Sequence, residues 1–240
     1  MSLLEAKNVS KRFEGLLAND NVTFSIDKGE IVGLIGPNGA GKTTLFNCLT
    51  GFRKPDAGTV MFSSNNITGF APERIATMGM VRTFQITKIF TSMTVLDNVM
   101  VGALMRHADV KEALEVAREA IGFTQLQGRD NILGSSLTVA DRKRVEVARA
   151  LATGPSLLML DEAMAGLNPT EVTDAIELVR RIRDRGITVM LVEHIMEVIM
   201  PLSSRVLVMD NGALIAEGRP DEIASDPKVI RAYLGENWDA

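Results

Sequence analysis

The sequence contains a single cysteine, and this shortage excludes one way of stabilising a fold. With only Cys48 among 240 residues, no disulfide can form within the chain. Cys48 lies in the apolar stretch Leu45-Phe46-Asn47-Cys48-Leu49 and is predicted to be a small buried residue. A cytosolic compartment is therefore expected.

Long hydrophobic runs and an excess of positive charge are also missing. No window reaches the ~18 apolar residues that span a bilayer, so a membrane role is expected to come through a partner. Residues 1–7 lack a basic region followed by an apolar run, which predicts no signal peptide. The net charge of -4 argues against a dedicated nucleic-acid binder, which usually carries a basic face.

What the chain does contain suits one compact α/β domain with a small insert. Hydrophobic residues make up 46% of it, which is ample for a core, and the thirteen methionines are predicted to be adaptable core filler. Apolar runs of strand length are found at residues 4–9, 22–26, 30–35, 59–62, 157–160, 188–192, 205–209 and 213–216. Helical patterns are found at residues 43–49, 72–78, 110–121, 169–185, 194–200 and 220–234.

The alternation of strands and helices predicts a mainly parallel sheet covered on both faces. Helical spacing dominates between residues 87 and 151, which predicts a helical insert. The expected division is a core of residues 1–86 and 153–240 and a helical subdomain of residues 87–152. Asp210-Asn211-Gly212 between two strand patterns predicts a hairpin.

A glycine-rich segment follows the third predicted strand and matches the phosphate-loop pattern in full. It reads Gly36-Pro37-Asn38-Gly39-Ala40-Gly41-Lys42-Thr43-Thr44. Glycines let the backbone wrap around phosphates, and the helix that follows offers its positive end to the same anion. Lys42 is predicted to bind the β- and γ-phosphates of ATP, and the Thr43 hydroxyl to bind Mg²⁺. The simpler interpretation is a glycine-rich turn that matches by chance.

Two acids, Asp161 and Glu162, end a later apolar strand. Parallel sheets bind ligands at the carboxyl ends of their strands, so these acids and the phosphate loop are expected to meet at one edge. Asp161 suits a role near Mg²⁺, and Glu162 is placed to polarise an attacking water. The alternative is a pair of exposed turn acids.

The order of the remaining motifs resembles the ATP-binding-cassette (ABC) ATPases over nearly the whole chain. Gln85 stands where that family carries its glutamine loop, and His194 where it carries the switch histidine. Phe13 is similar to the aromatic residue that stacks on adenine, and the D-loop is matched by Ala165-Gly166-Leu167-Asn168-Pro169. Taken alone, Gln85 and His194 could be ordinary structural polar residues, and Phe13 could be part of the core.

The resemblance implies a P-loop fold with a RecA-like parallel-sheet core, an N-terminal antiparallel β subdomain and a helical subdomain. It implies hydrolysis of MgATP, with Glu162, His194 and Gln85 as catalytic residues. Thr43, Gln85 and Asp161 would lie at the metal. Phe13 and residues 36–44 would bind the nucleotide.

Within the family the chain most resembles the ATPase subunits of bacterial branched-chain amino acid importers. The similar stretches are residues 45–52, 81–85, 93–98 and 229–235. This implies integral-membrane permease subunits, a second ATPase subunit and, indirectly, a substrate-binding protein as partners, and no nucleic acid. It also implies a cytoplasmic protein peripheral to the inner face of the membrane.

The sequence departs from the family at its signature loop, Leu-Ser-Gly-Gly-Gln, which completes the ATP site of the other subunit of a dimer. Here the matching residues are Leu137-Thr138-Val139-Ala140-Asp141. Val139 and Ala140 add side chains where bare backbone usually approaches the γ-phosphate, and Asp141 adds a negative charge. A homodimer would then carry two weakened sites, whereas a heterodimer with an intact signature would have one competent site. The heterodimer is favoured. Ala163 also replaces the proline that usually follows the catalytic glutamate.

Other functions remain open. The cargo could be amides, urea, another amino acid or an exported lipid, and the motifs do not separate these. A soluble ABC protein of DNA repair or translation usually has two cassettes or a long coiled-coil insert, and this chain has neither. A GTPase would need an Asn-Lys-x-Asp motif, which the chain lacks. A small-molecule kinase would not need the series of Gln85, the signature stretch and His194.

Overall fold

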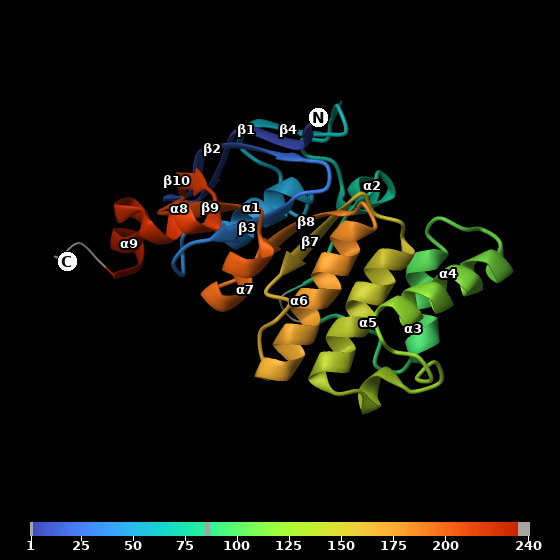
Figure 1. Cartoon of the computed structure of the whole chain (residues 1–240). Helices are drawn as coiled ribbons and strands as arrows, with labels where there is room; N and C mark the ends of the chain where they lie inside the picture. The colour runs from blue at the N-terminus through green and yellow to red at the C-terminus, as the bar shows by residue number, and fades with distance from the viewer. Residues whose placement is uncertain (1, 85–86, 235–240) are drawn as a thin grey trace.

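The protein is described by a computed structural model that covers residues 2–84 and 87–234 (Figure 1). Its central element is a six-stranded sheet with the strand order β10-β9-β3-β8-β7-β6. Every neighbouring pair in it is parallel except β9 with β10. The strands are β3 (Ile31–Ile35), β6 (Met80–Arg82), β7 (Leu157–Asp161), β8 (Thr188–Val192), β9 (Arg205–Asp210) and β10 (Ala213–Gly218).

The strands β3, β7 and β8 are buried at every position because both faces of this sheet are covered. Alternate residues of each strand belong to different hydrophobic clusters, as the period of two requires. On β3, Val32 and Leu34 pack on one side, whereas Ile31 and Ile35 pack on the other. The same alternation holds along β7, β8 and β9, so the sheet separates two cores.

One face of the central sheet is covered by α1 (Lys42–Leu49), which lies beneath a second, antiparallel sheet. The strand order of that sheet is β2-β1-β4-β5. Phe46 and Leu49 of α1 share a cluster with Leu4 and Phe62 of the antiparallel strands. The strands are β1 (Ser2–Phe13), β2 (Leu16–Asp27), β4 (Ala57–Phe62) and β5 (Asn65–Asn66).

The opposite face of the central sheet is covered by helices from the second half of the chain (Figure 1). Asn168 caps the longest of them: its side chain accepts the Glu171 N–H at 3.0 Å, and the Glu171 carboxylate accepts the Asn168 N–H at 3.0 Å. Pro169 follows at the first helical position, where it loses no hydrogen bond. The helices are α6 (Pro169–Asp184), α7 (Met196–Leu202), α8 (Pro220–Ser225) and α9 (Pro227–Leu234).

A helical layer extends the molecule to the right of the sheet in Figure 1. It has its own hydrophobic core, which includes Val99, Ala117 and Val145, each from a different helix. The layer comprises α3 (Val95–Ala103), α4 (Val110–Phe123), the short η1 (Gly134–Ser136) and α5 (Val139–Ala152); α2 (Pro72–Thr77) lies between the layer and the antiparallel sheet. The predicted domain boundaries at residues 86 and 153 stay a prediction.

The structure contains each predicted strand and helix, adds β5, β6, α3 and α5, and differs at several ends; β2, for example, begins at Leu16 rather than Val22. β1 runs to Phe13 rather than Val9, because its pairing with β2 continues through several register shifts. The predicted helix at 194–200 begins only at Met196, so His194 precedes it. The predicted C-terminal helix is two helices, interrupted at Asp226 because Pro227 disfavours a helical residue before it.

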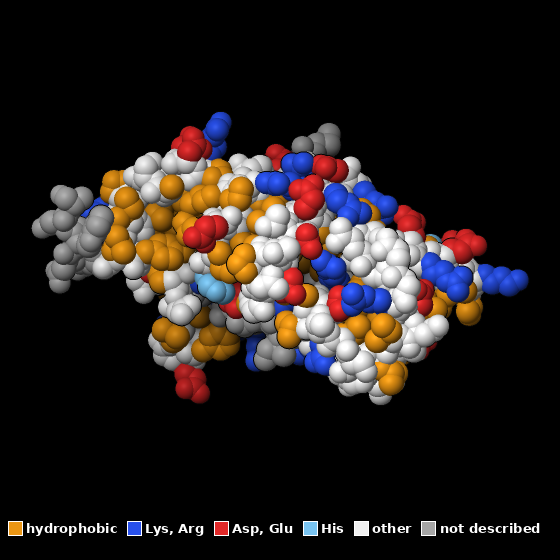
Figure 2. Space-filling model, turned by 60° about the horizontal axis from the view of Figure 1, so that its bottom comes forward, with side chains coloured by type: hydrophobic (Ala, Val, Ile, Leu, Met, Phe, Trp, Pro, Cys, Tyr) orange, Lys and Arg blue, Asp and Glu red, His pale blue; other side chains and the backbone are white. Residues whose placement is uncertain are grey.

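The surface differs between the two ends of the molecule. In Figure 2 hydrophobic side chains gather at the end that carries α8 and α9, whereas charges of both signs are dispersed over the helical layer. The predicted burial of Cys48 is confirmed, and burial raises the pKa of its thiol to about 11. Among residues 2–84 and 87–234, no helix is both long and apolar enough to cross a membrane.

Candidate nucleotide site

The predicted site residues follow three neighbouring strands of the central sheet. The phosphate loop leaves β3, Asp161 ends β7, and His194 follows β8, which lies between them. Because these strands are parallel, their carboxyl ends meet at one edge of the sheet. The expectation that the loop and the two acids share an edge is therefore confirmed.

The phosphate loop needs glycine at two positions for separate reasons. Gly36 has a φ of 151°, and a Cβ there would lie 2.1 Å from the Met209 carbonyl oxygen of β9. Gly41 has a φ of 97°, and a Cβ there would lie 2.2 Å from the Ala18 carbonyl oxygen of β2. The loop is thus held between the two sheets, where side chains do not fit.

Lys42, the first residue of α1, places its ammonium group over the loop. Its Nζ donates hydrogen bonds to the carbonyl oxygens of Gly36 at 2.6 Å and of Pro37 at 3.0 Å. Burial lowers the pKa of Lys42, and the charges of Glu162 and Asp161 oppose that shift. The cation therefore stands between the loop and the two acids.

Three supports of the loop were not found by sequence reasoning. Asn19 of β2 is fully buried, and its Nδ2 donates to the Gly41 carbonyl at 3.1 Å. Gly212 of the β9–β10 turn donates its N–H to the Ala40 carbonyl at 3.1 Å. Tyr233 of α9 lies near the backbone of Gly36, and partial burial raises the pKa of its phenol. Of these three residues, only Gly212 was marked by a sequence pattern, as part of the predicted hairpin turn.

A single cleft brings most of the predicted nucleotide-binding residues together. Its walls are Phe13, Leu16, Ala18, residues 38–44 and Glu162. The Phe13 ring is 40% exposed, so it is available to a planar ligand rather than packed in the core. Gly36, Pro37, Asp161 and His194 lie outside the walls of this cleft, and Gln85 lies outside the described residues.

Asp161 is buried in an ion pair that the sequence did not reveal. Its Oδ2 lies 2.7 Å from Nη2 of Arg82, at the end of β6. Arg82 also donates to Asn47 Oδ1 at 2.7 Å, and its guanidinium group lies 4.9 Å from the centre of the Phe84 ring. Burial raises the pKa of Asp161, and the positive charge of Arg82 opposes that shift.

Glu162 begins a tight turn directly after β7. Its backbone has a φ of 48°, the left-handed conformation, and its N–H donates to the Val192 carbonyl at 2.9 Å. Its own carbonyl accepts the Ala165 N–H at 3.2 Å, which closes the turn. A strained residue held by its surroundings is a common feature of functional sites.

His194 is exposed, immediately after the buried Glu193. Oε1 of Glu193 accepts the Met164 N–H at 2.9 Å. Burial raises the pKa of the Glu193 carboxyl. The structure thus places His194 at the same sheet edge as Asp161 but does not bring it into the cleft.

The stretch that matches the signature loop lies at the start of α5, away from this cleft. Thr138 caps that helix by accepting the Asp141 N–H at 3.2 Å, and its hydroxyl donates to the Asp141 carboxylate at 2.9 Å. Arg129 forms an ion pair with the same carboxylate. Leu137 and Ala140 are buried, whereas Val139 is 57% exposed. The charge of Asp141 is therefore paired within the chain.

The comparisons with known proteins agree with this geometry. The family model described as ABC transporter matches residues 19–165, and the model described as branched-chain amino acid ATP-binding cassette transporter matches residues 213–239. The chain is 42% identical to the high-affinity branched-chain amino acid transport ATP-binding protein LivG of Salmonella typhimurium, with 98% of each chain covered. The chain belongs to the ATPase subunits of ABC transporters, of the LivG and BraF type.

BraF, the corresponding high-affinity transport protein of Pseudomonas aeruginosa, is 39% identical to this ATPase subunit over 98% of both chains. A nucleotide-free ATP-binding cassette from an ABC transporter superposes with a TM-score of 0.89 at 34% identity, covering 98% of this chain and 100% of that one. A cassette in its ADP conformation gives the same TM-score, identity and coverage. The predicted ABC ATPase fold, with its antiparallel and parallel sheets, is confirmed.

The residues that line the cleft of this ATPase subunit suit a nucleoside triphosphate. The ammonium group of Lys42, the glycine loop and the start of α1 can bind phosphates. The exposed Phe13 ring can stack on a base. The Thr43 side chain is exposed at the same wall, and Asp161 lies one residue from Glu162 on the chain. Hydroxyl and carboxylate oxygens are the ligands that Mg²⁺ takes, so these residues also fit a metal bound with the phosphates.

Proposed function

We propose that the chain hydrolyses MgATP in the cleft between Phe13, the phosphate loop and Glu162, and that this powers import of branched-chain amino acids through membrane permease subunits. The observation that carries the proposal is the joint lining of one cleft by the loop, an exposed aromatic ring and a carboxylate. The cargo is supported by the full-length similarity to LivG and BraF. The protein would lie at the cytoplasmic face of the membrane.

In this mechanism the chain's residues bind the phosphates and orient the water. Lys42 and the N–H groups of the loop bind the β- and γ-phosphates and offset the charge that develops on them. Glu162 orients the attacking water and accepts its proton, and His194 contacts the γ-phosphate once a second subunit closes the site. Thr43, Asp161 and Gln85 would hold Mg²⁺, which neutralises phosphate charge.

The second subunit is proposed to be a different ATPase. Thr138 retains a hydroxyl, but the exposed Val139 side chain would stand where a partner's γ-phosphate approaches. A partner with an intact signature loop would complete the site on this chain. Closure of the dimer would then move the helical layers and, with them, the membrane subunits.

The cargo is tested by uptake in source cells that lack the chain. We expect slow uptake of labelled leucine, isoleucine and valine, restored by the wild-type chain and not by Lys42→Ala, with urea uptake unchanged. Normal uptake of all three amino acids in the deletion strain would contradict this cargo. The matched control is Lys54→Ala, an exposed lysine outside the cleft.

A further inference from the structure

Lys143 reaches from the helical layer to the turn that carries Glu162. It lies on α5, five residues after Thr138, and its Nζ donates to the Glu162 carbonyl oxygen at 3.2 Å. That carbonyl also accepts the Ala165 N–H, so Lys143 binds the same oxygen atom that closes the turn. The side chain thus makes a direct polar contact between α5 and this turn.

The turn has a second polar anchor on its other side. Oε1 of Glu193, one residue beyond β8, accepts the Met164 N–H at 2.9 Å. Burial lowers the pKa of Lys143, and the negative charges of Glu193, Glu146 and Glu162 oppose this shift. Negative charges on α5, on the turn and just after β8 therefore favour the charged form of Lys143.

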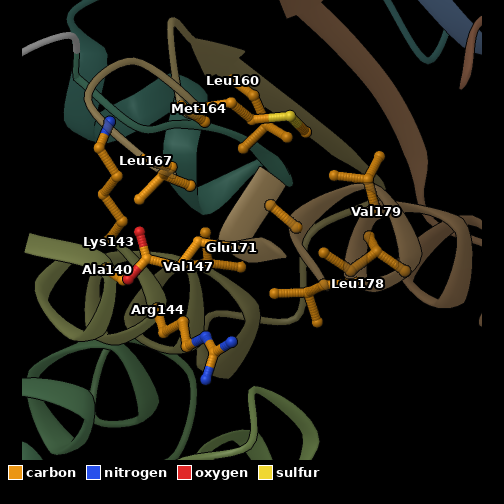
Figure 3. Close-up of a pocket in the computed structure, with 13 residues that line it drawn as sticks. Ala140, Lys143, Arg144, Val147, Leu160, Met164, Leu167, Glu171, Leu178 and Val179 are labelled. Carbon is orange, nitrogen blue, oxygen red and sulfur yellow. The ribbon is translucent and has the colours of Figure 1, made fainter. Parts of the chain in front are cut away.

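A small apolar cavity lies beside the turn, next to the buried Met164. Met164 and Leu167 of the turn segment face Val147 of α5 and Leu178 of α6 across it. Figure 3 shows Lys143 extended along one side of this cavity, with Leu178 and Val179 on the other. Side chains that border a cavity have fewer contacts on that side, so the polar contacts of Lys143 and Glu193 add to what holds the turn.

The residue after Glu162 permits the backbone conformation of this turn. Glu162 adopts a left-handed φ of 48°, which a proline at position 163 would disfavour and Ala163 allows. α5 contacts the same turn through Lys143.

We propose that Lys143 is a positioning residue that couples α5, the helix of the signature stretch, to the placement of the Glu162 carboxylate. This inference rests on the proposed catalytic role of Glu162. A movement of α5 when a partner binds at Thr138 and Val139 would be transmitted through Lys143 to the turn. Glu162 would then be aligned with water only when the helical layer is correctly seated.

The kinetic test uses Lys143→Met in the transporter assembled with its membrane subunits. We expect kcat to fall about 10- to 100-fold, since a small displacement of a catalytic group has such effects, with the KM for ATP unchanged. Lys143→Arg should restore most of the rate because it keeps a cationic donor. Arg144→Met is the matched control: it removes the neighbouring side chain, which pairs with Asp174 rather than with the turn, and should leave kcat unchanged.

A double-mutant cycle separates positioning from general damage. Because Lys143 acts through Glu162, adding Lys143→Met to Glu162→Gln should lower turnover no further than Glu162→Gln alone. Equal losses in both backgrounds, or wild-type kcat for Lys143→Met, would overturn the proposal. Brisk turnover by Glu162→Gln would instead overturn the proposed role of Glu162.

A structural readout does not depend on turnover. Amide hydrogen exchange across residues 160–168 should speed up in Lys143→Met, while exchange in α3 and α4 and the melting temperature stay near wild type. Unchanged exchange in this segment would overturn the proposal. If Lys143→Met is unstable, hydrogen exchange across residues 160–168 is compared between Lys143→Arg and Lys143→Gln instead. Faster exchange is expected only for the glutamine variant, and equal exchange in both would overturn the proposal.

Discussion

Arg82 and Asp161 form an ion pair inside the protein, with 2.7 Å between Nη2 and Oδ2 and side chains that are 7% and 2% exposed. The pair joins β6 to β7 directly beside the cleft. Arg82 contacts Oδ2 of Asp161, which leaves Oδ1 for the proposed contact with Mg²⁺. Because both side chains are buried, loss of Arg82 would leave the charge of Asp161 without a partner and would destabilise the fold.

Removing Arg82 should therefore be strongly destabilising. Arg82→Met leaves the Asp161 carboxylate buried without its partner, and we expect a loss of about 3–5 kcal/mol of unfolding free energy, measured by urea denaturation. Arg183→Met, which breaks an ion pair between exposed side chains, is the control and should change stability by less than ~1 kcal/mol. A loss for Arg82→Met as small as that of the control would show that Asp161 is not held as described.

Tyr233 offers a test of how the C-terminal helix supports the phosphate loop. Tyr233→Phe removes only the hydroxyl, which lies near the Gly36 backbone and would accept its N–H. A net hydrogen bond contributes about 0.5–1.5 kcal/mol, so ATP binding should weaken by a factor of roughly two to ten, as measured by fluorescence titration. Leu234→Ala, at the next, exposed position, should bind ATP normally. Identical affinities for Tyr233→Phe and the wild type would exclude support of the loop by α9.

Glu146 predicts a pH dependence of stability. This buried residue of α5 accepts the Phe84 N–H at 3.2 Å, and burial raises the pKa of its carboxyl above the ordinary 4.5. From that ordinary value up to the raised one, the folded state holds a proton that the unfolded state has released. The contribution of Glu146 to stability therefore falls as the pH rises through this window.

Glu146→Gln removes the titration but keeps an oxygen that can accept the Phe84 N–H. The difference in unfolding free energy, variant minus wild type, should thus rise in favour of the variant from about pH 4.5 upward, and level off once the wild-type carboxyl is ionised. Thermal denaturation from pH 4 to 8 measures it. A difference that does not change with pH would mean that the pKa of Glu146 is not raised.

The signature stretch can be tested by restoring the family sequence. Replacing Thr138-Val139-Ala140-Asp141 by Ser-Gly-Gly-Gln removes the exposed Val139 side chain, and we expect faster ATP turnover of the assembled complex. The change also removes the partner of Arg129, so Arg129→Gln is needed as a second change to avoid an unpaired charge. Unchanged turnover in both forms would show that the natural stretch does not weaken a site.

The parts of the site that the sequence predicted are those encoded in short contiguous patterns. The loop from Gly36 to Thr44 and the acids at 161 and 162 each follow an apolar strand, and parallel strands bring their ends together. The hairpin at Asn211-Gly212 was equally local, with both residues at positive φ. Such features need no knowledge of distant residues.

The parts that were missed depend on contacts between distant segments. Arg82 meets Asp161 across 79 positions of sequence, and Asn19 meets Gly41 across 22. No local pattern marks such a pair, because arginine and asparagine are common on surfaces. The sequence predicts a helix over residues 194–200, but that helix starts only at Met196, so His194 lies before it. Gln85 lies outside the described residues, so its predicted role stays a prediction.

The account depends most on Glu162 as the residue that activates water in a nucleotide-filled cleft. The decisive measurement is phosphate release from MgATP by Glu162→Gln in the assembled transporter, with bound nucleotide quantified on the same sample. We predict full occupancy by uncleaved ATP and turnover at least ~100-fold slower than wild type, as expected on loss of a general base. Phosphate release at the wild-type rate with the cleft occupied would contradict the account.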